Sequence, residues 1–185
     1  MIIGLTGGNA SGKGEAASYL KSKCFEYYSL SDILREDAES RGIELSRDNL
    51  IRLGNELREK KGPSILADLV AKKIKNKNNC VIDSIRNPFE IKALRKLNDF
   101  TLIGIDAPVE IRFKRAISRK RQSDPETLEE FVEKERRENT DSSTKQQLEN
   151  CLKLADAIII NDSTIEEFHK KIDLVLKNHS TYAVE

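Results

Sequence analysis

The sequence predicts an α/β domain built on a five-stranded parallel sheet flanked by helices. Five short apolar runs, helical periodicity between them and a glycine-rich loop after the first run support this class. The runs are nearly continuous rather than alternating, which is typical of strands buried on both faces of a parallel sheet. The expected strands are Ile2–Thr6, Phe25–Leu30, Cys80–Asp83, Thr101–Asp106 and Ala157–Ile160.

The helical segments predict right-handed crossovers between parallel strands. A length of 185 residues fits a single domain spanning 1–185. Two segments are too long for simple crossovers, namely a helical insert at 32–78 and a lid at 120–146. We expect the tail at 179–185 to be frayed.

The insert has room for three helices. The first is expected from Asp32 to about Ser40, and the second carries Leu50, Leu53 and Leu57 on one face. The third is expected to open at Pro63, because proline suits the first turn of a helix. In the lid, Asp124-Pro125 is expected to open a helix with Leu128, Phe131 and Val132 on one face.

Composition excludes several classes of protein. The formal net charge is +1, which gives no reason to expect nucleic acid or a membrane surface as partner. No stretch resembles a signal peptide or a membrane span. Cys24, Cys80 and Cys151 form no metal-binding or disulfide pattern, so each is expected to be a small buried side chain. We therefore expect a cytoplasmic protein, monomeric or homodimeric.

A phosphate-binding loop follows the first strand. The spacing of Gly7, four residues, and then Gly12-Lys13 is that of the P-loop, and it lies between a strand and a helix as that motif requires. Backbone N–H groups of such a loop cradle phosphates, and the lysine neutralises charge on the β- and γ-phosphates. The sequence therefore predicts a P-loop NTPase fold that binds ATP. The expected ATP-binding loop residues are Gly7, Gly8, Asn9, Ala10, Ser11, Gly12, Lys13, Gly14 and Glu15.

The loop departs from the usual motif after Lys13. A serine or threonine hydroxyl normally helps to hold Mg²⁺ at the next position, but here Gly14 and then Glu15 follow. Metal binding must therefore depend on water and on acids elsewhere. This departure favours an alternative interpretation, a nucleotide-binding sensor with little turnover.

The segments GGNASGKG and SLSDILRED resemble the first loop and the segment after the second strand of adenylate kinase and related nucleoside-monophosphate kinases. Those kinases usually carry a glycine where Ala10 stands. The resemblance implies that Arg35 pairs with the acceptor phosphate, with Asp32 nearby. The alternative for Arg35 is a solvated helix residue.

The segment VIDSIRNP at residues 81–88 resembles the third strand and following loop of the same kinases. Asp83 ends an apolar strand, where it could order the waters of Mg²⁺. The resemblance implies that Arg86 holds the acceptor phosphate. The alternative for Asp83 is a helix cap.

The segment at residues 104–124 is similar to the fourth strand, its helix and the lid entrance of those kinases. Arg115 and Arg119 are four residues apart and so share one helical face. The resemblance implies that both grip the transferring phosphates, with a basic surface helix as the alternative. The segment LADAIIINDST looks more like dephospho-CoA kinase, which implies that Asn161 lies near the adenine of ATP.

These features together predict an ATP- and Mg²⁺-dependent kinase. Lys13, Asp83, Arg115 and Arg119 are the expected catalytic residues, and Asp83 is the expected metal residue through water. Asp32, Arg35 and Arg86 are expected to bind the acceptor, a nucleotide-like small molecule such as a nucleoside monophosphate. Dephospho-CoA kinase activity is the alternative within the same class of enzyme.

Overall fold

A five-stranded parallel sheet with strand order β2-β3-β1-β4-β5 forms the centre of the protein. The computed structural model describes residues 1–75, 77–119 and 126–182, and residues 179–182 only as backbone. The strands are β1 (Ile2–Thr6), β2 (Glu26–Ser29), β3 (Cys80–Asp83), β4 (Phe100–Asp106) and β5 (Ala157–Ile160). The predicted fold class is confirmed.

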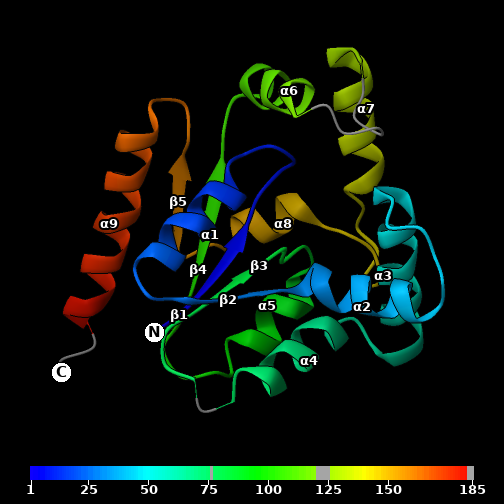
Figure 1. Cartoon of the computed structure of the whole chain (residues 1–185), viewed down its shortest axis with the longest axis horizontal. Helices are drawn as coiled ribbons and strands as arrows, with labels where there is room; N and C mark the ends of the chain where they lie inside the picture. Colours follow the sequence, from blue (N-terminus) through cyan, green and yellow to red (C-terminus); the bar gives the residue numbers. More distant parts are fainter. Residues whose placement is uncertain (76, 120–125, 183–185) are drawn as a thin grey trace.

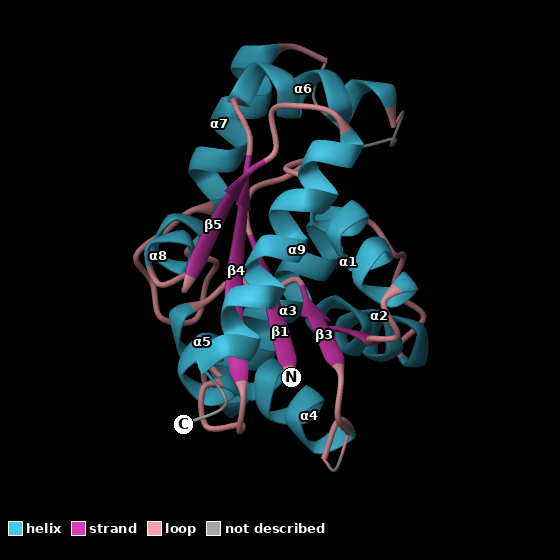
Figure 2. Ribbon diagram, turned by 90° about the vertical axis from the view of Figure 1, so that its left-hand side faces the viewer, coloured by secondary structure: helices cyan, strands magenta, loops and turns pink. Residues whose placement is uncertain are grey.

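Helices cover both faces of this sheet (Figures 1 and 2). Helices α1 and α9 lie on one face, while α2, α4, α5 and α8 lie on the other. The described helices are α1 (Lys13–Ser22), α2 (Leu30–Ser40), α3 (Arg47–Lys61), α4 (Ile65–Lys73), α5 (Pro88–Leu94), α6 (Val109–Ser118), α7 (Leu128–Glu138), α8 (Leu148–Lys153) and α9 (Ile165–Tyr182). Helices α6 and α7 lie together beyond the carboxyl end of the sheet (Figure 1).

Only the inner strands are buried on both faces. Every residue of β1 is buried, whereas the two edge strands expose several side chains. Tyr27 on β2 and Ile158 on β5 are 38% and 55% exposed. The expectation of burial on both faces was therefore wrong for the edge strands, because helices cover an edge strand less completely than an inner strand.

The helical insert contains α2, α3 and α4, as predicted, but two helix starts differ. Helix α2 begins at Leu30 because the Ser29 side chain caps it by accepting the N–H of Ser31. Helix α4 begins at Ile65, after Ser64, so Pro63 precedes the helix instead of opening it.

The segment expected to form the lid contains one described helix, α7. Residues 120–125, including Asp124-Pro125, lie outside the described residues. Helix α7 starts at Leu128, because the Thr127 hydroxyl accepts the N–H of Glu130. Phe131 is buried, but Val132 is 44% exposed, so the expected shared face was wrong for Val132.

The structure also bears on the C-terminal tail, on the three cysteines and on membrane spans. The tail expected at 179–185 overlaps α9, which continues to Tyr182, while residues 183–185 lie outside the described residues. Cys80 and Cys151 are buried, but Cys24 is exposed in the turn after α1, so that prediction was wrong for Cys24. Among the described residues, no helix is both long enough and apolar enough to cross a membrane.

Candidate nucleotide and acceptor sites

The loop between β1 and α1 has the backbone that a P-loop requires. Gly7 and Gly12 have positive φ angles of 142° and 113°. A Cβ atom on Gly7 would lie 2.0 Å from the carbonyl oxygen of Ile105, and one on Gly12 would lie 2.1 Å from Nδ2 of Asn161. Glycine is therefore required at both positions for conformation and for space.

Ala10 also has a left-handed backbone conformation, with φ at 58°. This conformation costs a residue with a Cβ roughly 1–2 kcal/mol. Resemblance to the monophosphate kinases suggested a glycine here, and the φ angle gives the physical reason. The loop thus stores backbone strain beside the phosphate site.

Lys13, the first residue of α1, folds back over the loop. Its Nζ donates to the carbonyl oxygens of Gly7 and Gly8, at 2.8 and 2.7 Å. Burial lowers the pKa of Lys13 to about 8, partly offset by the negative charge of Asp83, while the charge of Arg86 adds to the lowering. A phosphate beside Nζ would restore the full positive charge of this side chain.

Asp83 ends β3, the strand next to β1, as predicted. One carboxylate oxygen accepts the N–H of Ser84 at 2.6 Å, and the other accepts the hydroxyl of Tyr27 at 3.4 Å. Ser84 has a left-handed backbone with φ at 66°, which turns the chain sharply after the strand. The carboxylate is therefore held in one orientation close enough to Lys13 to affect its pKa.

The described residues hold no group of three or more His, Cys, Asp and Glu side chains suited to a metal ion. A single carboxylate beside phosphates is nevertheless enough for Mg²⁺, which keeps several of its waters. Asp83 fits that requirement.

Gly14 borders open space, and the Glu15 side chain is directed toward α9. Nothing lies within 4 Å of a Cβ atom built on Gly14, so this position has room for a side chain. The Glu15 carboxylate lies 2.8 Å from Nε2 of His169 on α9, and the His169 ring stacks on Tyr19. Glu15 therefore supports the packing of α1 on α9 and leaves the phosphate site free of its charge.

Two arginines, one in α6 and one at its C-terminal cap, lie beside the loop. Arg119 donates to Oδ1 of Asn9 at 3.2 Å, and Arg115 donates to Oδ1 of Asn161 at 3.4 Å. Asn161 is buried, and its Nδ2 donates to the carbonyl oxygen of Ser11 at 2.9 Å. Arg119 thus contacts the loop directly, whereas Arg115 contacts Asn161, which in turn supports the loop.

Two residues beside the loop were not predicted. Glu135 on α7 accepts the backbone N–H of Asn9 at 3.2 Å, and it pairs with Arg112 on α6. Arg112 lies so near Gly8 that a Cβ atom there would be 2.9 Å from its Nη1. The sequence places Arg112 on the same basic helix as Arg115, but nothing local marks Glu135.

A cavity of about 550 Å³ opens beside the loop, and Asn9 forms part of its wall. This volume is within the range of small-molecule sites. Its lining includes the predicted Arg35 and Arg86, together with two arginines from α3 that sequence reasoning did not assign. The arginines in its wall are Arg35, Arg47, Arg58 and Arg86.

Asp32 does not line this cavity, but it forms an ion pair with Arg35 at 2.5 Å. A larger cavity of about 1160 Å³ lies between α3 and α7 and shares Ile51 and Gln146 with the first. It contains no residue of the phosphate loop, so the smaller cavity is better placed to receive a phosphoryl group.

Three of the four arginines already have a carboxylate partner. Asp32 pairs with Arg35, and Arg58 forms a fully buried pair with Glu90 at 2.8 Å. Arg47 pairs with a carboxylate of α7, described below. Each of these positive charges is therefore balanced before any acceptor binds.

Arg86 differs from the other three arginines. Within the described parts of the chain no carboxylate lies within 4.0 Å of its guanidinium, and its Nη1 donates to the neutral Gln146 at 3.0 Å. Burial lowers the pKa of Arg86, and the neighbouring charge of Arg47 lowers it further. A half-buried cation without an ion-pair partner is suited to bind an anion.

Behind this cavity, Glu90 and Asn87 organise the turn that carries Arg86. Glu90 is fully buried and accepts the N–H groups of Arg86 and Asn87, at 2.9 and 3.1 Å. Asn87 caps α5 and donates to the carbonyl oxygens of Ser143 and Lys145, at 2.7 and 2.8 Å. The turn that carries Arg86 and the segment after α7 are therefore joined through hydrogen bonds.

The parallel sheet, the phosphate loop and the arginine-lined cavity beside it define a P-loop NTPase of the kinase-like type. In agreement, the AAA domain model AAA_17 matches residues 6–132. Two solved structures share the fold: TT1252 from Thermus thermophilus and shikimate kinase from Aquifex aeolicus. Their TM-scores are 0.62 and 0.56, each is 23% identical, and the matches cover 96% and 98% of this chain and 97% and 99% of theirs.

The chain belongs to the UPF0200 family. A UPF0200 protein of Pyrococcus abyssi is 33% identical over 184 residues, which cover 96% of both chains. A UPF0200 protein of Sulfurisphaera tokodaii is 35% identical over 95% of this chain and 96% of its own. A UPF0200/UPF0201 protein of Archaeoglobus fulgidus is 34% identical, and the match covers 95% of this chain but 54% of that protein.

Proposed function

We propose that this protein is an ATP-dependent phosphotransferase whose acceptor is a nucleotide-like small molecule, a nucleoside monophosphate. The observation that carries the proposal is Arg86, a half-buried guanidinium without a carboxylate partner in the described residues, in a cavity that reaches Asn9 of the phosphate loop. An acceptor with an anionic group would supply the missing partner. The arginines around it favour a phosphate.

The proposed reaction needs little covalent chemistry from the protein. An oxygen of the acceptor phosphate attacks the γ-phosphorus of ATP, the bond to the β,γ-bridging oxygen breaks, and ADP leaves. An ionised phosphate oxygen carries no proton, so no general base is required. Catalysis then consists of positioning and of neutralising charge.

Each site residue has a role in this proposal. The loop amides and Lys13 hold the β- and γ-phosphates, Arg35 and Arg86 hold the acceptor, and Arg115 and Arg119 stabilise the transferring group. Mg²⁺, when bound, neutralises the β- and γ-phosphates, and Asp83 would order its waters.

The acceptor assignment is tested by ADP release with ATP and Mg²⁺ against AMP, CMP, dCMP, UMP, dTMP, GMP and dephospho-CoA. We expect stimulation by a monophosphate, and Arg86→Gln should raise the KM for that acceptor by about tenfold or more, the effect of losing a charged hydrogen bond. Arg41→Gln, an exposed arginine at the end of α2, is the control and should leave KM unchanged. Stimulation by dephospho-CoA alone would assign the alternative activity.

Gly14 favours a second candidate function, a nucleotide-binding sensor with little turnover. The space around Gly14 provides a direct test, because a serine hydroxyl there could bind Mg²⁺. We expect Gly14→Ser to lower the Mg²⁺ concentration for half-maximal turnover by about three- to tenfold relative to Gly14→Ala, which adds Cβ without the hydroxyl. Equal behaviour of the two variants would show that no metal binds there.

Phosphoryl transfer by the unchanged protein decides between the kinase and the sensor. Measurable transfer by the unchanged protein supports the kinase. ATP binding without transfer to any acceptor, together with turnover gained in Gly14→Ser, would support the sensor.

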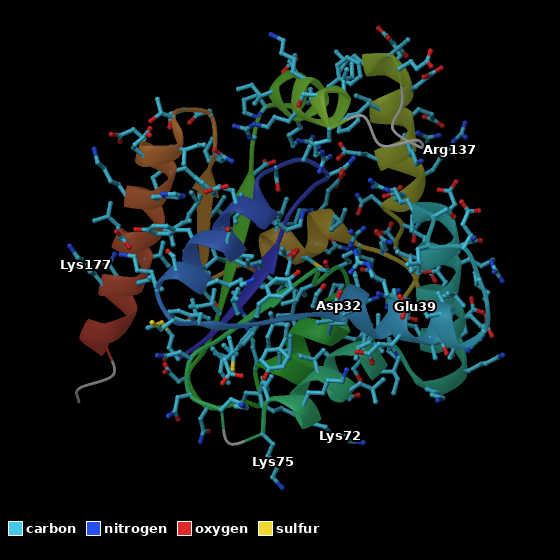
Figure 3. All side chains as sticks on the ribbon, viewed as in Figure 1. Asp32, Glu39, Lys72, Lys75, Arg137 and Lys177 are labelled. Carbon is cyan, nitrogen blue, oxygen red and sulfur yellow. The ribbon has the colours of Figure 1, made fainter. Side chains whose placement is uncertain are left out.

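Four basic side chains on the surface lie at separate places. Lys72 and Lys75 extend from one end of the protein, whereas Arg137 on α7 and Lys177 on α9 lie far from them and from each other (Figure 3). These four charges therefore do not belong to one basic stripe of the kind that binds a nucleic-acid backbone.

A further inference from the structure

Helix α7 presents two carboxylates, three residues apart, to the two candidate phosphate sites. Glu135 faces the nucleotide side, where it accepts the backbone N–H of Asn9 at 3.2 Å and pairs with Arg112. A backbone N–H of a P-loop and an adjacent guanidinium are the groups that bind phosphate oxygens. The Glu135 carboxylate therefore occupies donors suited to a nucleotide phosphate.

Glu138 occupies donors suited to a phosphate on the acceptor side. Its two oxygens accept hydrogen bonds from Nε and Nη2 of Arg47, at 2.9 and 2.6 Å, in a bidentate pair. The pair is well shielded from water, since Glu138 and Arg47 are 7% and 21% exposed. Arg47 lines the acceptor cavity, so this carboxylate occupies donors suited to an acceptor phosphate.

We propose that Arg47 and Arg112 are further phosphate-binding residues, and that Glu138 and Glu135 of α7 hold them while the sites are empty. Substrate phosphate oxygens replace the carboxylate oxygens, so each substrate competes with α7. The inference rests on the proposed function only in taking the loop as a nucleotide site and the adjacent cavity as an acceptor site.

Because both carboxylates belong to one short helix, the two competitions are linked. A phosphate that displaces Glu135 weakens the hold of α7 on Arg47, and an acceptor that displaces Glu138 weakens its hold on the loop. Each substrate therefore makes the other bind more tightly. Couplings of this kind typically change affinity by about 5- to 150-fold.

The test is calorimetric titration of the full chain with ADP and Mg²⁺, without any acceptor. We expect Glu135→Ala to lower the Kd for ADP by about five- to tenfold, since a charged hydrogen bond no longer competes. Glu138→Ala should also lower it, by about threefold or more, although Glu138 touches only the acceptor side. This distant effect is specific to the linked mechanism.

Glu133→Ala is the matched control. It makes the same substitution in the same helix, but among the described residues the ion pairs of Glu133 are with Arg136 and Arg137 on the surface. We expect its Kd for ADP to stay within about twofold of the unchanged protein, because exposed ion pairs contribute little.

The inference is overturned if Glu138→Ala leaves the Kd unchanged, or if no variant binds ADP. Failure of the kinase assignment is seen separately, as absence of phosphoryl transfer in a protein that still binds ADP.

Discussion

Replacement of Lys13 by alanine is expected to lower kcat for phosphoryl transfer by about 10²- to 10³-fold, the usual cost of removing a group that stabilises transition-state charge. Burial lowers the pKa of Lys13 to about 8, so the folded protein holds this charge at some cost. Its two hydrogen bonds to the carbonyl oxygens of Gly7 and Gly8 offset part of that cost. The free energy of unfolding should therefore change by only about 1 kcal/mol.

The measurements are single-turnover kinetics and urea denaturation on the same preparations. Lys21→Ala is the control, because Lys21 is an exposed residue in the last turn of the same helix. Full activity in Lys13→Ala would contradict the catalytic role assigned to Lys13 and to the phosphate loop. Loss of folding in this variant would instead show that Lys13 is a structural residue.

Glu90→Gln is expected to destabilise the protein by about 3–5 kcal/mol, because it leaves the buried guanidinium of Arg58 without a charged partner. The pair is 3% and 0% exposed, and Glu90 also accepts the N–H groups of Arg86 and Asn87. Arg86 depends on this turn for its position. Variants that stay folded should therefore also lose affinity for the acceptor.

Urea denaturation measures this effect directly. Glu36→Gln is the control, since Glu36 pairs with Lys73 on the surface, where the two side chains are 62% and 44% exposed. That change should cost no more than about 1 kcal/mol. Equal effects of the two substitutions would contradict the importance assigned to the buried pair.

Local sequence patterns predicted the sheet and the phosphate loop well. The strands β1, β3 and β5 begin and end at the expected residues. Continuous β-branched runs bounded by polar residues can be recognised from neighbouring residues in the sequence alone. The exposure of Tyr27 and Ile158 was not predicted, because it depends on which strands form the edges of the sheet. Strand order arises from long-range pairing and has no local signature.

The site was predicted as far as its residues lie within short motifs. Lys13 lies in the phosphate loop, and Arg86 lies in the cavity beside it, as expected. Arg47 and Glu138, by contrast, are 91 residues apart and each looks like an ordinary charge on an amphipathic helix. Only the tertiary arrangement, which places the end of α7 beside the start of α3, brings them together, so no spacing in the sequence indicates the pair.

The side-chain amide of Asn87 donates two hydrogen bonds, to the carbonyl oxygens of Ser143 and Lys145, and these bonds limit how α7 can move. They fix the segment that follows the C-terminal end of this helix to the body of the protein. A helix fixed beyond one end can swing but cannot slide, and displacement grows with distance from the fixed point. Glu138 is the last residue of α7, so opening the helix would displace it less than Glu135, nearly one helical turn further from the pivot.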